Sequence, residues 1–266
     1  ERTQTLRNAE RYTTPELREF ERRATGAEAR AIERERELFQ SMCESLASLT
    51  TEINAFGQAI AEPDVLRAFA EKAVQRSWKR PEMVAEPTLS IHAGRHPVLD
   101  ESLGSEFVPN DCELGTPGKA ALALITGPNM AGKSTFIRQT ALIALLAHAG
   151  SFVPADRATI GIVDRIFTRI GADDALHAGQ STFMVEMIET ANILNHATPS
   201  SLVVLDEVGR GTSTLDGLSL AWAIVEHLAG DTGRPGPRSL FATHYHELTD
   251  LEEQLAGQVQ NLHVAV

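Results

Sequence analysis

Two glycines, a lysine and a serine occur in this sequence at the spacing found where proteins bind nucleotide phosphates. The segment Gly127-Pro-Asn-Met-Ala-Gly-Lys-Ser134 fits the pattern G-x-x-x-x-G-K-[S/T]. Its glycines allow the backbone to curl so that N–H groups point inward at phosphate oxygens, and a helix starting near Lys133 would add its positive end. Lys133 would then reach the β- and γ-phosphates of ATP, and the hydroxyl of Ser134 would hold Mg²⁺.

The expected nucleotide-binding residues of this loop form one continuous segment. They are Gly127, Pro128, Asn129, Met130, Ala131, Gly132, Lys133, Ser134 and Thr135. The alternative is a tight turn that carries a surface lysine. An apolar run before the loop and a helical run after it favour phosphate binding, because this is the context that the motif requires.

A pair of acids ends a second apolar run, Leu202-Val-Val-Leu-Asp-Glu207. At the end of a strand, Asp206 would bind Mg²⁺ directly or through water, and Glu207 would orient or deprotonate the attacking water. A positioned base of this kind contributes roughly 10²–10⁴-fold to a rate. The alternative is that both carboxylates cap a helix, but the loop upstream favours catalysis.

A histidine ends a third apolar run, in Thr243-His-Tyr-His-Glu247. His244 could hydrogen-bond the γ-phosphate or the attacking water. A single histidine is more often structural, but its position at a strand end of a nucleotide-binding domain favours function. We therefore predict an Mg²⁺-dependent ATP hydrolase in which Lys133, Glu207 and His244 are catalytic and in which Ser134 and Asp206 hold the metal.

These motifs need strands that end at a common edge, and the sequence after about residue 87 predicts them. Apolar β-type runs cover 121–126, 201–205 and 239–243, and helical stretches cover 133–148, 215–228 and a short segment after His246. This alternation is typical of an α/β domain with a largely parallel sheet, in which ligands bind at the carboxyl ends of the strands. The segment 230–237 is rich in Gly and Pro and predicts a surface loop.

The first 85 residues have a different pattern, with many charges and an apolar stripe. The stripe advances by alternating steps of three and four: Phe39, Met42, Leu46, Leu49, Ile53, Phe56 and Ile60. This spacing indicates a long helix lying along another helix. We predict that Pro63 ends it and opens a new helix, that the helices form a hairpin with a packed seam, and that Cys43 is buried there. The predicted domains are 1–85, a helical lever, and 86–266, a P-loop ATPase domain.

The composition limits the classes of function. A net charge of −12 argues against this piece wrapping duplex DNA by itself. Two cysteines, Cys43 and Cys112, are too few for a disulfide framework or a zinc site, and free thiols fit a cytoplasmic protein. The longest apolar stretch, 140–149, is too short to span a bilayer. The sequence begins without Met or a signal peptide and reads as a fragment of a longer protein.

Several of these segments together resemble the MutS family of DNA mismatch-repair proteins. They are Thr126-Gly-Pro-Asn-Met-Ala-Gly-Lys-Ser-Thr135, Ser181-Thr-Phe-Met-Val-Glu-Met187, Asp206-Glu-Val-Gly-Arg-Gly-Thr-Ser213, Phe241-Ala-Thr-His-Tyr245 and Gly94-Arg-His-Pro97. The start, Thr5-Leu-Arg-Asn-Ala-Glu-Arg11, resembles the family's return from its DNA clamp into long lever helices. The resemblance covers nearly the whole chain.

The resemblance implies a dimeric ATPase with the fold of ABC-type ATPases, in which two nucleotides lie between two subunits. Ser181 would reach, in trans, the γ-phosphate bound by the partner subunit, and Asn129 would bond the phosphates in its own loop. Phe107 matches the position whose ring stacks on adenine. The alternatives are a helix cap for Ser181, a turn residue for Asn129 and a core aromatic for Phe107.

The resemblance also implies a role in DNA mismatch repair. ATP binding would close the dimer, the lever helices would carry the change toward DNA, and hydrolysis would reset it. The partners would be a second MutS-like subunit, mismatched duplex DNA reached through domains absent from this chain, and a downstream protein such as MutL. In the family, the chain continues past Val266 with further strands, a second adenine-binding histidine and a helix-turn-helix that locks the dimer.

Three other functions were weighed against this one. An ABC-type transporter or chromosome-maintenance ATPase would carry a Leu-Ser-Gly-Gly-Gln-like signature, whereas the sequence has Ala178-Gly-Gln-Ser181. A MutS-like paralogue acting on recombination intermediates or ribosomes stays open, because the domains that discriminate lie elsewhere. A protein that binds ATP without turnover is disfavoured by the presence of Glu207.

Overall fold

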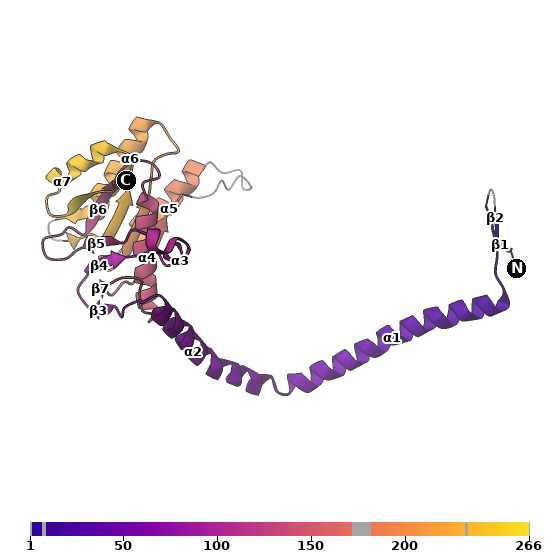
Figure 1. Ribbon diagram of the computed structural model, residues 1–266. Coiled ribbons are helices and arrows are strands. Elements are labelled where there is room, and N and C mark those ends of the chain that lie inside the picture. The colour runs from indigo at the N-terminus through magenta and orange to yellow at the C-terminus, as the bar shows by residue number, and fades with distance from the viewer. Residues whose placement is uncertain (1, 7–8, 172–181, 232–233, 266) are drawn as a thin grey trace. The chain divides into compact units, whose positions relative to one another are not determined.

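The computed structural model describes residues 2–6, 9–171, 182–231 and 234–265. The chain forms two compact units, residues 1–66 and 67–266. The second unit is an α/β fold with a five-stranded parallel sheet and a four-stranded mixed sheet (Figure 1), which confirms the predicted α/β class. In the described part of the chain, no helix has both the length and the apolar character needed to cross a membrane.

The larger sheet has the strand order β13-β6-β12-β9-β8. Its strands are β6 (Leu122–Thr126), β8 (Ile166–Arg169), β9 (Leu202–Asp206), β12 (Arg238–Ala242) and β13 (Val259–His263). All four pairings are parallel. Every residue of β6, β9 and β12 is buried, as expected of parallel strands covered on both faces. These three strands are the three apolar runs predicted from the sequence.

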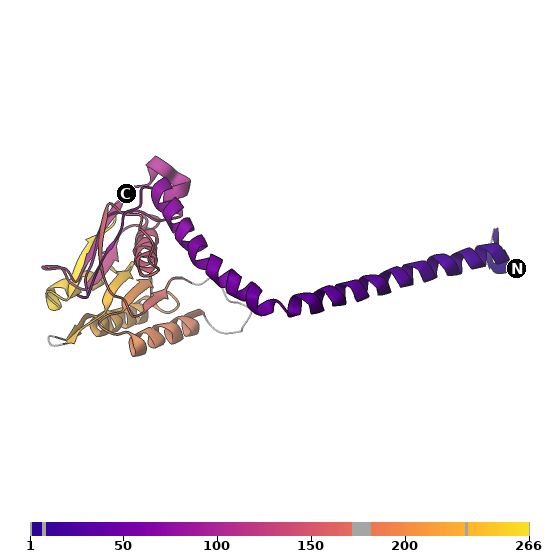
Figure 2. The same cartoon turned by 90° about the horizontal axis from the view of Figure 1, so that it is seen from below.

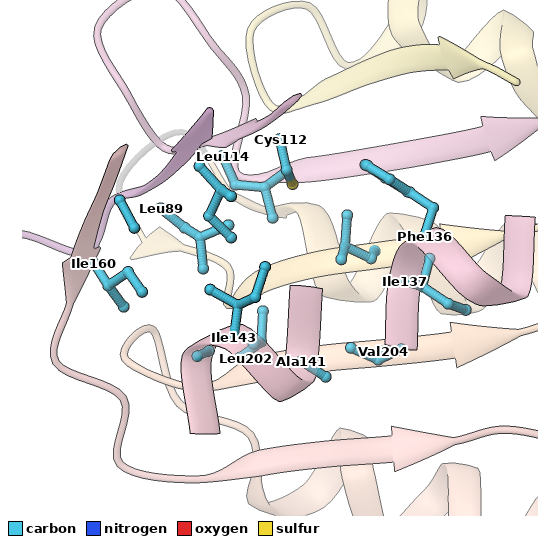
Figure 3. Close-up of a cluster of buried hydrophobic side chains, with 14 of the residues drawn as sticks. Leu89, Cys112, Leu114, Phe136, Ile137, Ala141, Ile143, Ile160, Leu202 and Val204 are labelled. Atoms are coloured by element: carbon cyan, nitrogen blue, oxygen red, sulfur yellow. The ribbon is translucent and has the colours of Figure 1, made fainter. Parts of the chain in front are cut away.

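Neighbouring residues of these strands face two separate cores, because side chains alternate along a strand. Ile125 and Val204 pack with α4 in one cluster (Figure 3), whereas Leu124 and Leu205 pack with α5, α6 and η3 in the other. The helices are α3 (Leu99–Leu103), η1 (Gly104–Glu106), α4 (Lys133–His148), α5 (Thr182–His196), α6 (Thr214–Ala229), η3 (His246–Asp250) and α7 (Leu251–Gln254). The parallel sheet is therefore a middle layer, with α4 on one face and α6 on the other.

A second sheet, not predicted from the sequence, covers α4 on its other side. Its order is β3-β7-β4-β5, with β3 (Glu82–Val84), β4 (Leu89–Gly94), β5 (Asn110–Leu114) and β7 (Arg157–Gly161). Leu89, Cys112 and Ile160 from three of these strands share the buried cluster with Ile143 of α4 (Figure 3). The strands are short, and β7 pairs with strands far earlier in the sequence, Glu82 with Thr159 and Leu89 with Ile160, so the sequence shows no local sign of this sheet.

One buried arginine joins the two sheets. Arg238, the first residue of β12, is 1% exposed. Its guanidinium donates hydrogen bonds to the carbonyl oxygens of Thr88 at 3.0 Å, Gly161 at 2.9 Å, Ile162 at 3.0 Å and Ser200 at 2.8 Å. Burial lowers the pKa of Arg238 from its ordinary value, and the nearby carboxylate of Asp164 opposes that effect. The charge is thus held mainly by backbone oxygens of segments far apart in the sequence.

The N-terminal unit begins with the hairpin of β1 (Arg2–Leu6) and β2 (Ala9–Tyr12), followed by α1 (Pro15–Ala47) and by the first part of α2 (Thr50–Gln75), whose residues after 66 belong to the second unit. The prediction that Pro63 separates two helices is wrong, since α2 continues through it. A proline inside a helix removes one backbone hydrogen bond at a cost of about 3 kcal/mol, and the good helix formers on either side of it allow the helix to continue.

The break lies instead at Ser48 and Leu49, between the two helices (Figure 2). The Ser48 hydroxyl donates to the Ser45 carbonyl at 2.8 Å, and the Leu49 N–H donates to the Leu46 carbonyl at 2.9 Å. A serine that satisfies nearby backbone groups with its own side chain competes with the helical pattern. Ser48, rather than the later proline, therefore marks the division between the helices.

The predicted packed seam is also wrong for this chain. Neither α1 nor α2 contains a buried residue among those described. Phe39 is 62% exposed and Phe56 68% exposed, and Cys43, predicted to be buried, is exposed. Helical spacing decides which residues share a face, but it does not supply the surface that covers them.

The segment 230–237, predicted as a surface loop, contains a small antiparallel pair. Its strands are β10 (Gly230–Asp231) and β11 (Arg234–Pro235). Pro237, immediately before β12, is buried. The connection between α6 and β12 therefore contains paired strands at 230–231 and 234–235, which its Gly and Pro content did not indicate.

Candidate active site

Three loops that carry the predicted chemistry follow three neighbouring strands. β6, β12 and β9 pair side by side and run parallel, so their carboxyl ends meet at one edge of the sheet. Gly127 follows β6, Thr243 follows β12, and Glu207 follows β9. The sheet order therefore brings together three motifs that are far apart in the sequence.

The loop between β6 and α4 turns through three residues with positive φ. These angles are 146° at Gly127, 65° at Met130 and 97° at Gly132. A Cβ atom on Gly127 would lie 2.6 Å from the carbonyl oxygen of Val264, so the loop passes too close to the chain after β13 for a side chain at this position. Gly132 is the left-handed residue that caps α4. The backbone thus curls directly into a helix N-terminus, which is the arrangement that favours anions.

Lys133, the first residue of α4, has its ammonium group folded over this loop. The residue is only 5% exposed, and Nζ donates to the carbonyl oxygens of Gly127 at 2.7 Å and Pro128 at 3.0 Å. A buried charge requires such partners. The structure therefore places one cation at the concave side of the loop, and Ser134 and Thr135 follow it half-buried.

Asp206 ends β9 with its carboxylate incompletely partnered. The residue is 9% exposed, and its Oδ1 atom is buried without a hydrogen-bond partner. Its Oδ2 atom lies 4.0 Å from a guanidinium nitrogen of Arg138, which projects from α4 one turn after Ser134. A buried carboxylate oxygen without a donor is costly in a folded protein. The site at Asp206 thus suits an additional cation.

Glu207, the next residue, has a left-handed backbone. Its φ is 55°, a conformation that costs a residue other than glycine about 1–3 kcal/mol and that is concentrated at functional sites. Its N–H donates to the carbonyl of Ala242 at the end of β12, at 2.9 Å. Its Oε2 atom pairs with Arg210 at 2.7 Å. The backbone therefore turns at Glu207, directly after Asp206 ends β9.

His244 lies after β12, exposed, with its ring 4.1 Å from that of Tyr245 between centroids. Partial burial lowers the pKa of His244 below its ordinary value, and the positive charges of Arg210 and Lys133 lower it further, while the carboxylates of Glu207 and Glu247 oppose them. The pKa thus responds to groups from all three loops. Lys133, Glu207 and His244, predicted separately from the sequence, are electrostatic neighbours in the structure.

A cleft of about 320 Å³ lies beside this group. Charged side chains dominate its lining: Arg138, Arg169, Arg210, Glu186, Asp206 and Glu207. A cleft with alternating cationic and anionic side chains can hold a ligand that is itself highly charged, together with a counter-ion. Its position at the carboxyl ends of parallel strands is where ligands bind in open α/β sheets.

Several of these residues were not predicted from the sequence. Arg138 and Arg169 carry no motif signal, and Glu186 and Arg210 were quoted only as parts of family segments. Arg169 ends β8 and is 7% exposed, with a guanidinium nitrogen 3.6 Å from the Glu186 carboxylate. The one local signal is Glu186 itself, a buried acid on a helix whose neighbours are mainly apolar.

Two predicted residues are not joined to this group. Ser181 lies outside the described residues, and α5 begins at Thr182 directly after it. Phe107 is half-buried at the end of η1, in the connection between β4 and β5 of the mixed sheet. Asn129 and Met130 are exposed in the loop before α4. Contact of these side chains with a nucleotide stays a prediction.

Comparison with known proteins gives consistent matches. A family model described as MutS domain V matches residues 123–266. The chain is 56% identical over 266 residues to the DNA mismatch repair protein MutS of Desulfitobacterium hafniense (strain Y51), covering 100% of this chain and 30% of that protein. Its identity to the DNA mismatch repair protein MutS of Myxococcus xanthus (strain DK1622) is 54% over 267 residues, with 100% and 30% covered.

A third relative is the DNA mismatch repair protein MutS of Rhodopirellula baltica (strain DSM 10527 / NCIMB 13988 / SH1). It is 57% identical over 266 residues, which cover 100% of this chain and 29% of that protein. The chain therefore spans about 30% of the length of the curated relatives that it matches. The domain V model alone matches more than half of the chain, and the chain belongs to the MutS family.

Proposed function

We propose that this chain is the ATP-binding and ATP-hydrolysing module of a DNA mismatch-repair protein. The observation that carries the proposal is the meeting of three loops at adjacent strand ends, with Lys133, Asp206, Glu207 and His244 on one edge of a parallel sheet. A cradle of backbone N–H groups, a cation, a metal-binding acid and a base are the parts that phosphoryl transfer to water requires.

The loop of residues 127–132 is proposed to be a P-loop that wraps the β- and γ-phosphates of ATP. Phosphate oxygens would take the place of the Gly127 and Pro128 carbonyls that now accept from Lys133. The N-terminus of α4 would add its partial positive charge. Asn129 and Thr135 would complete the phosphate contacts, and the ring of Phe107 would stack on adenine, as the family resemblance implies.

Mg²⁺ is proposed to bind between Ser134 and Asp206. The buried Oδ1 atom of Asp206, which has no hydrogen-bond partner, fits such an ion. No group of three or more His, Cys, Asp or Glu is placed to bind a metal in the described part of the chain, so water and phosphate oxygens would supply the remaining ligands, as is usual for Mg²⁺. When bound, the ion would neutralise charge that develops on the phosphates.

Glu207 is proposed to act on the attacking water and His244 to bond that water or the γ-phosphate. One oxygen of the Glu207 carboxylate pairs with Arg210 at 2.7 Å, which leaves the other oxygen to accept from water. A neutral imidazole can both donate and accept, and the lowered pKa of His244 keeps its ring neutral near physiological pH. The two groups would thereby position one water for in-line attack.

The wider role is proposed from the relatives, which are all named DNA mismatch repair proteins. Two copies would form a homodimer in which Ser181 of one subunit reaches the nucleotide of the other. The complete protein would contact mismatched DNA through parts outside this chain and recruit a downstream protein such as MutL, in the cytoplasm. ATP binding and hydrolysis would then switch its state on DNA.

ATP turnover measured against protein concentration tests this proposal. Glu207→Gln should keep nucleotide binding but reduce kcat by roughly 10²–10⁴-fold, and Lys133→Ala should abolish binding. A specific rate that rises with concentration would support a site completed by a second subunit. A Glu207→Gln variant that hydrolyses ATP at the unsubstituted rate would sink the assignment of the base.

A further inference from the structure

We infer that Glu186 and Tyr245 are positioning residues that hold the turn carrying Glu207 through the N–H and the carbonyl of one residue. The inference rests on the proposed ATP hydrolysis and names further residues of that site. Glu186 belongs to α5 and Tyr245 follows β12, so neither lies in the turn itself. Both contact the same residue of the turn, Gly209.

The turn after β9 needs external support, because its backbone is unusual at two points. Glu207 has φ 55° and Gly209 has φ 94°. Arg210 pairs with Glu207 from within the turn and therefore moves with it. The Glu207 N–H is tied to Ala242 of β12 at 2.9 Å, which anchors where the turn starts. The path of the chain beyond Glu207 must be held by other contacts.

Glu186 supplies the first of these contacts. Its Oε1 atom accepts a hydrogen bond from the Gly209 N–H at 2.5 Å, and its side chain is 9% exposed. Its Oε2 atom lies 3.6 Å from Arg169, which also pairs with Glu189 one turn further along α5, at 3.1 Å. The buried arginine thus stabilises the charged carboxylate, and a charge-assisted hydrogen bond is stronger than a neutral one.

Tyr245 supplies the second contact, to the carbonyl of the same residue. Its hydroxyl donates to the Gly209 carbonyl at 3.1 Å, and the residue is 5% exposed. The turn packs closely on α6, where a Cβ atom on Gly217 would lie 2.3 Å from both the Gly209 oxygen and the Tyr245 hydroxyl. The two hydrogen bonds therefore hold both the N–H and the carbonyl of Gly209, and the close packing leaves this residue no room to shift.

This arrangement predicts a separation between catalysis and binding. Glu186, Tyr245 and Gly209 make no hydrogen bond to the loop of residues 127–135 among the contacts described. Loosening Gly209 would displace the Glu207 carboxylate, whereas the proposed phosphate cradle would keep its shape. Loss of either contact should consequently lower kcat and leave the affinity for ATP nearly unchanged.

The experiment measures ATP turnover and nucleotide affinity for four variants of the chain. Tyr245→Phe removes one oxygen and keeps the ring, and Glu186→Ala removes the acceptor of the Gly209 N–H. Glu186→Gln keeps an acceptor but loses the charge. Glu189→Gln is the matched control, because Glu189 also pairs with Arg169 but is 48% exposed and is not the acceptor of the Gly209 N–H.

We expect Tyr245→Phe and Glu186→Ala each to lower kcat by about tenfold, the effect of one lost hydrogen bond to a charged or buried group, with the Kd for ATP changed less than about twofold. Glu186→Gln should recover part of the loss, and Glu189→Gln should match the unsubstituted chain. Unchanged kcat in both Tyr245→Phe and Glu186→Ala would overturn the inference. So would an equal fall of kcat and affinity in all four variants, because that indicates general loosening. If Glu186→Ala fails to fold, Tyr245→Phe decides.

Hydrogen exchange at the Gly209 amide gives a readout independent of turnover. Glu186→Ala should speed this exchange and Glu189→Gln should not. Equal exchange rates in the unsubstituted chain and in Glu186→Ala would contradict the proposed hold of Glu186 on the Gly209 N–H, whatever the ATPase result. If the unsubstituted chain does not turn over ATP but its Gly209 amide exchanges slowly and Glu186→Ala speeds that exchange, the proposed hydrolysis is contradicted and the positioning role of Glu186 is not. The two failures can therefore be told apart.

Discussion

The helices of residues 15–66 and the α/β unit of residues 67–266 show two different ways in which a sequence uses apolar residues. In the first region, a regular stripe at helical spacing stays exposed, with Phe39 at 62% and Ile53 at 51%. In the second, strands such as β6 and β9 are buried at every position. An apolar pattern therefore determines which face an element presents, and only the partner layers determine whether that face contributes to stability.

The largest change in stability that we expect is for the substitution of Arg238, in the buried α/β unit. Arg238→Met should lower the free energy of unfolding of the α/β unit by at least about 3 kcal/mol, because each buried carbonyl left without a donor costs about 1–3 kcal/mol. Urea unfolding followed by tryptophan fluorescence measures it, since both tryptophans, Trp78 and Trp222, belong to that unit. Arg36→Met, on the exposed surface of α1, is the control and should have no effect.

A pair of isoleucines tests the comparison with matched chemistry. Ile143 is fully buried in α4, whereas Ile53 in α2 is 51% exposed. Ile143→Ala should cost about 2–5 kcal/mol in unfolding free energy, from lost burial and the cavity that remains. Ile53→Ala should cost less than about 0.5 kcal/mol. A comparable loss at Ile53 would show that the α1 and α2 stripe is covered in solution.

The two cysteines allow the same comparison to be made without any substitution. Burial raises the pKa of the Cys112 thiol to about 12, whereas Cys43 is exposed on α1. A thiol reagent at pH 8 attacks the thiolate, so the native chain should react at one thiol, Cys43, and the unfolded chain at two. Mass spectrometry of the labelled peptides identifies the site. Rapid native labelling of Cys112 would contradict the burial of the sheet that carries it.

The smallest expected effect is a shift in the titration of His244. Burial and then Arg210 lower its pKa in the folded chain, so the unfolded chain binds more protons between the folded value and the ordinary value near 6.5. Stability contributed here is present above about pH 6.5 and falls as the pH drops toward the folded pKa. Arg210→Gln removes one cause and should raise the pKa of His244, as seen by NMR of the ring protons. A further fall would contradict the assignment of Arg210 as one of the groups that lower this pKa.

The part of the site that the sequence predicted is the part built from contiguous residues. The glycines and the lysine of the loop of residues 127–134 lie in one continuous segment. The acids at the end of β9 and the histidine after β12 each follow an apolar run. Their meeting at one edge follows from the parallel order alone. The predicted helix 133–148 agrees with α4 at both ends, because the motif fixes its start and Gly150 follows its end.

The sequence could not predict features that depend on which segments meet. Glu186 contacts Gly209 across 23 positions, and the mixed sheet pairs β3 with β7 across still more. The prediction at Pro63 was wrong because the good helix formers around it outweigh the effect of one proline. Ser48 acts instead through a side-chain hydrogen bond that residue spacing does not show. The prediction that α1 and α2 pack along a seam was wrong because residue spacing does not show which surface, if any, covers an apolar face.

Arg238 also has a consequence for the order in which this fold is assembled. Its four acceptors lie 38 to 150 positions away in the sequence, and all four can be bonded only when both sheets and the turn before β9 have come together. Closing such long loops costs entropy before the contacts can form, so we expect these hydrogen bonds to form after the folding barrier has been crossed. Replacing Arg238 should therefore accelerate unfolding while leaving the refolding rate nearly unchanged, which makes this arginine a determinant of the lifetime of the folded chain rather than of the speed with which it forms.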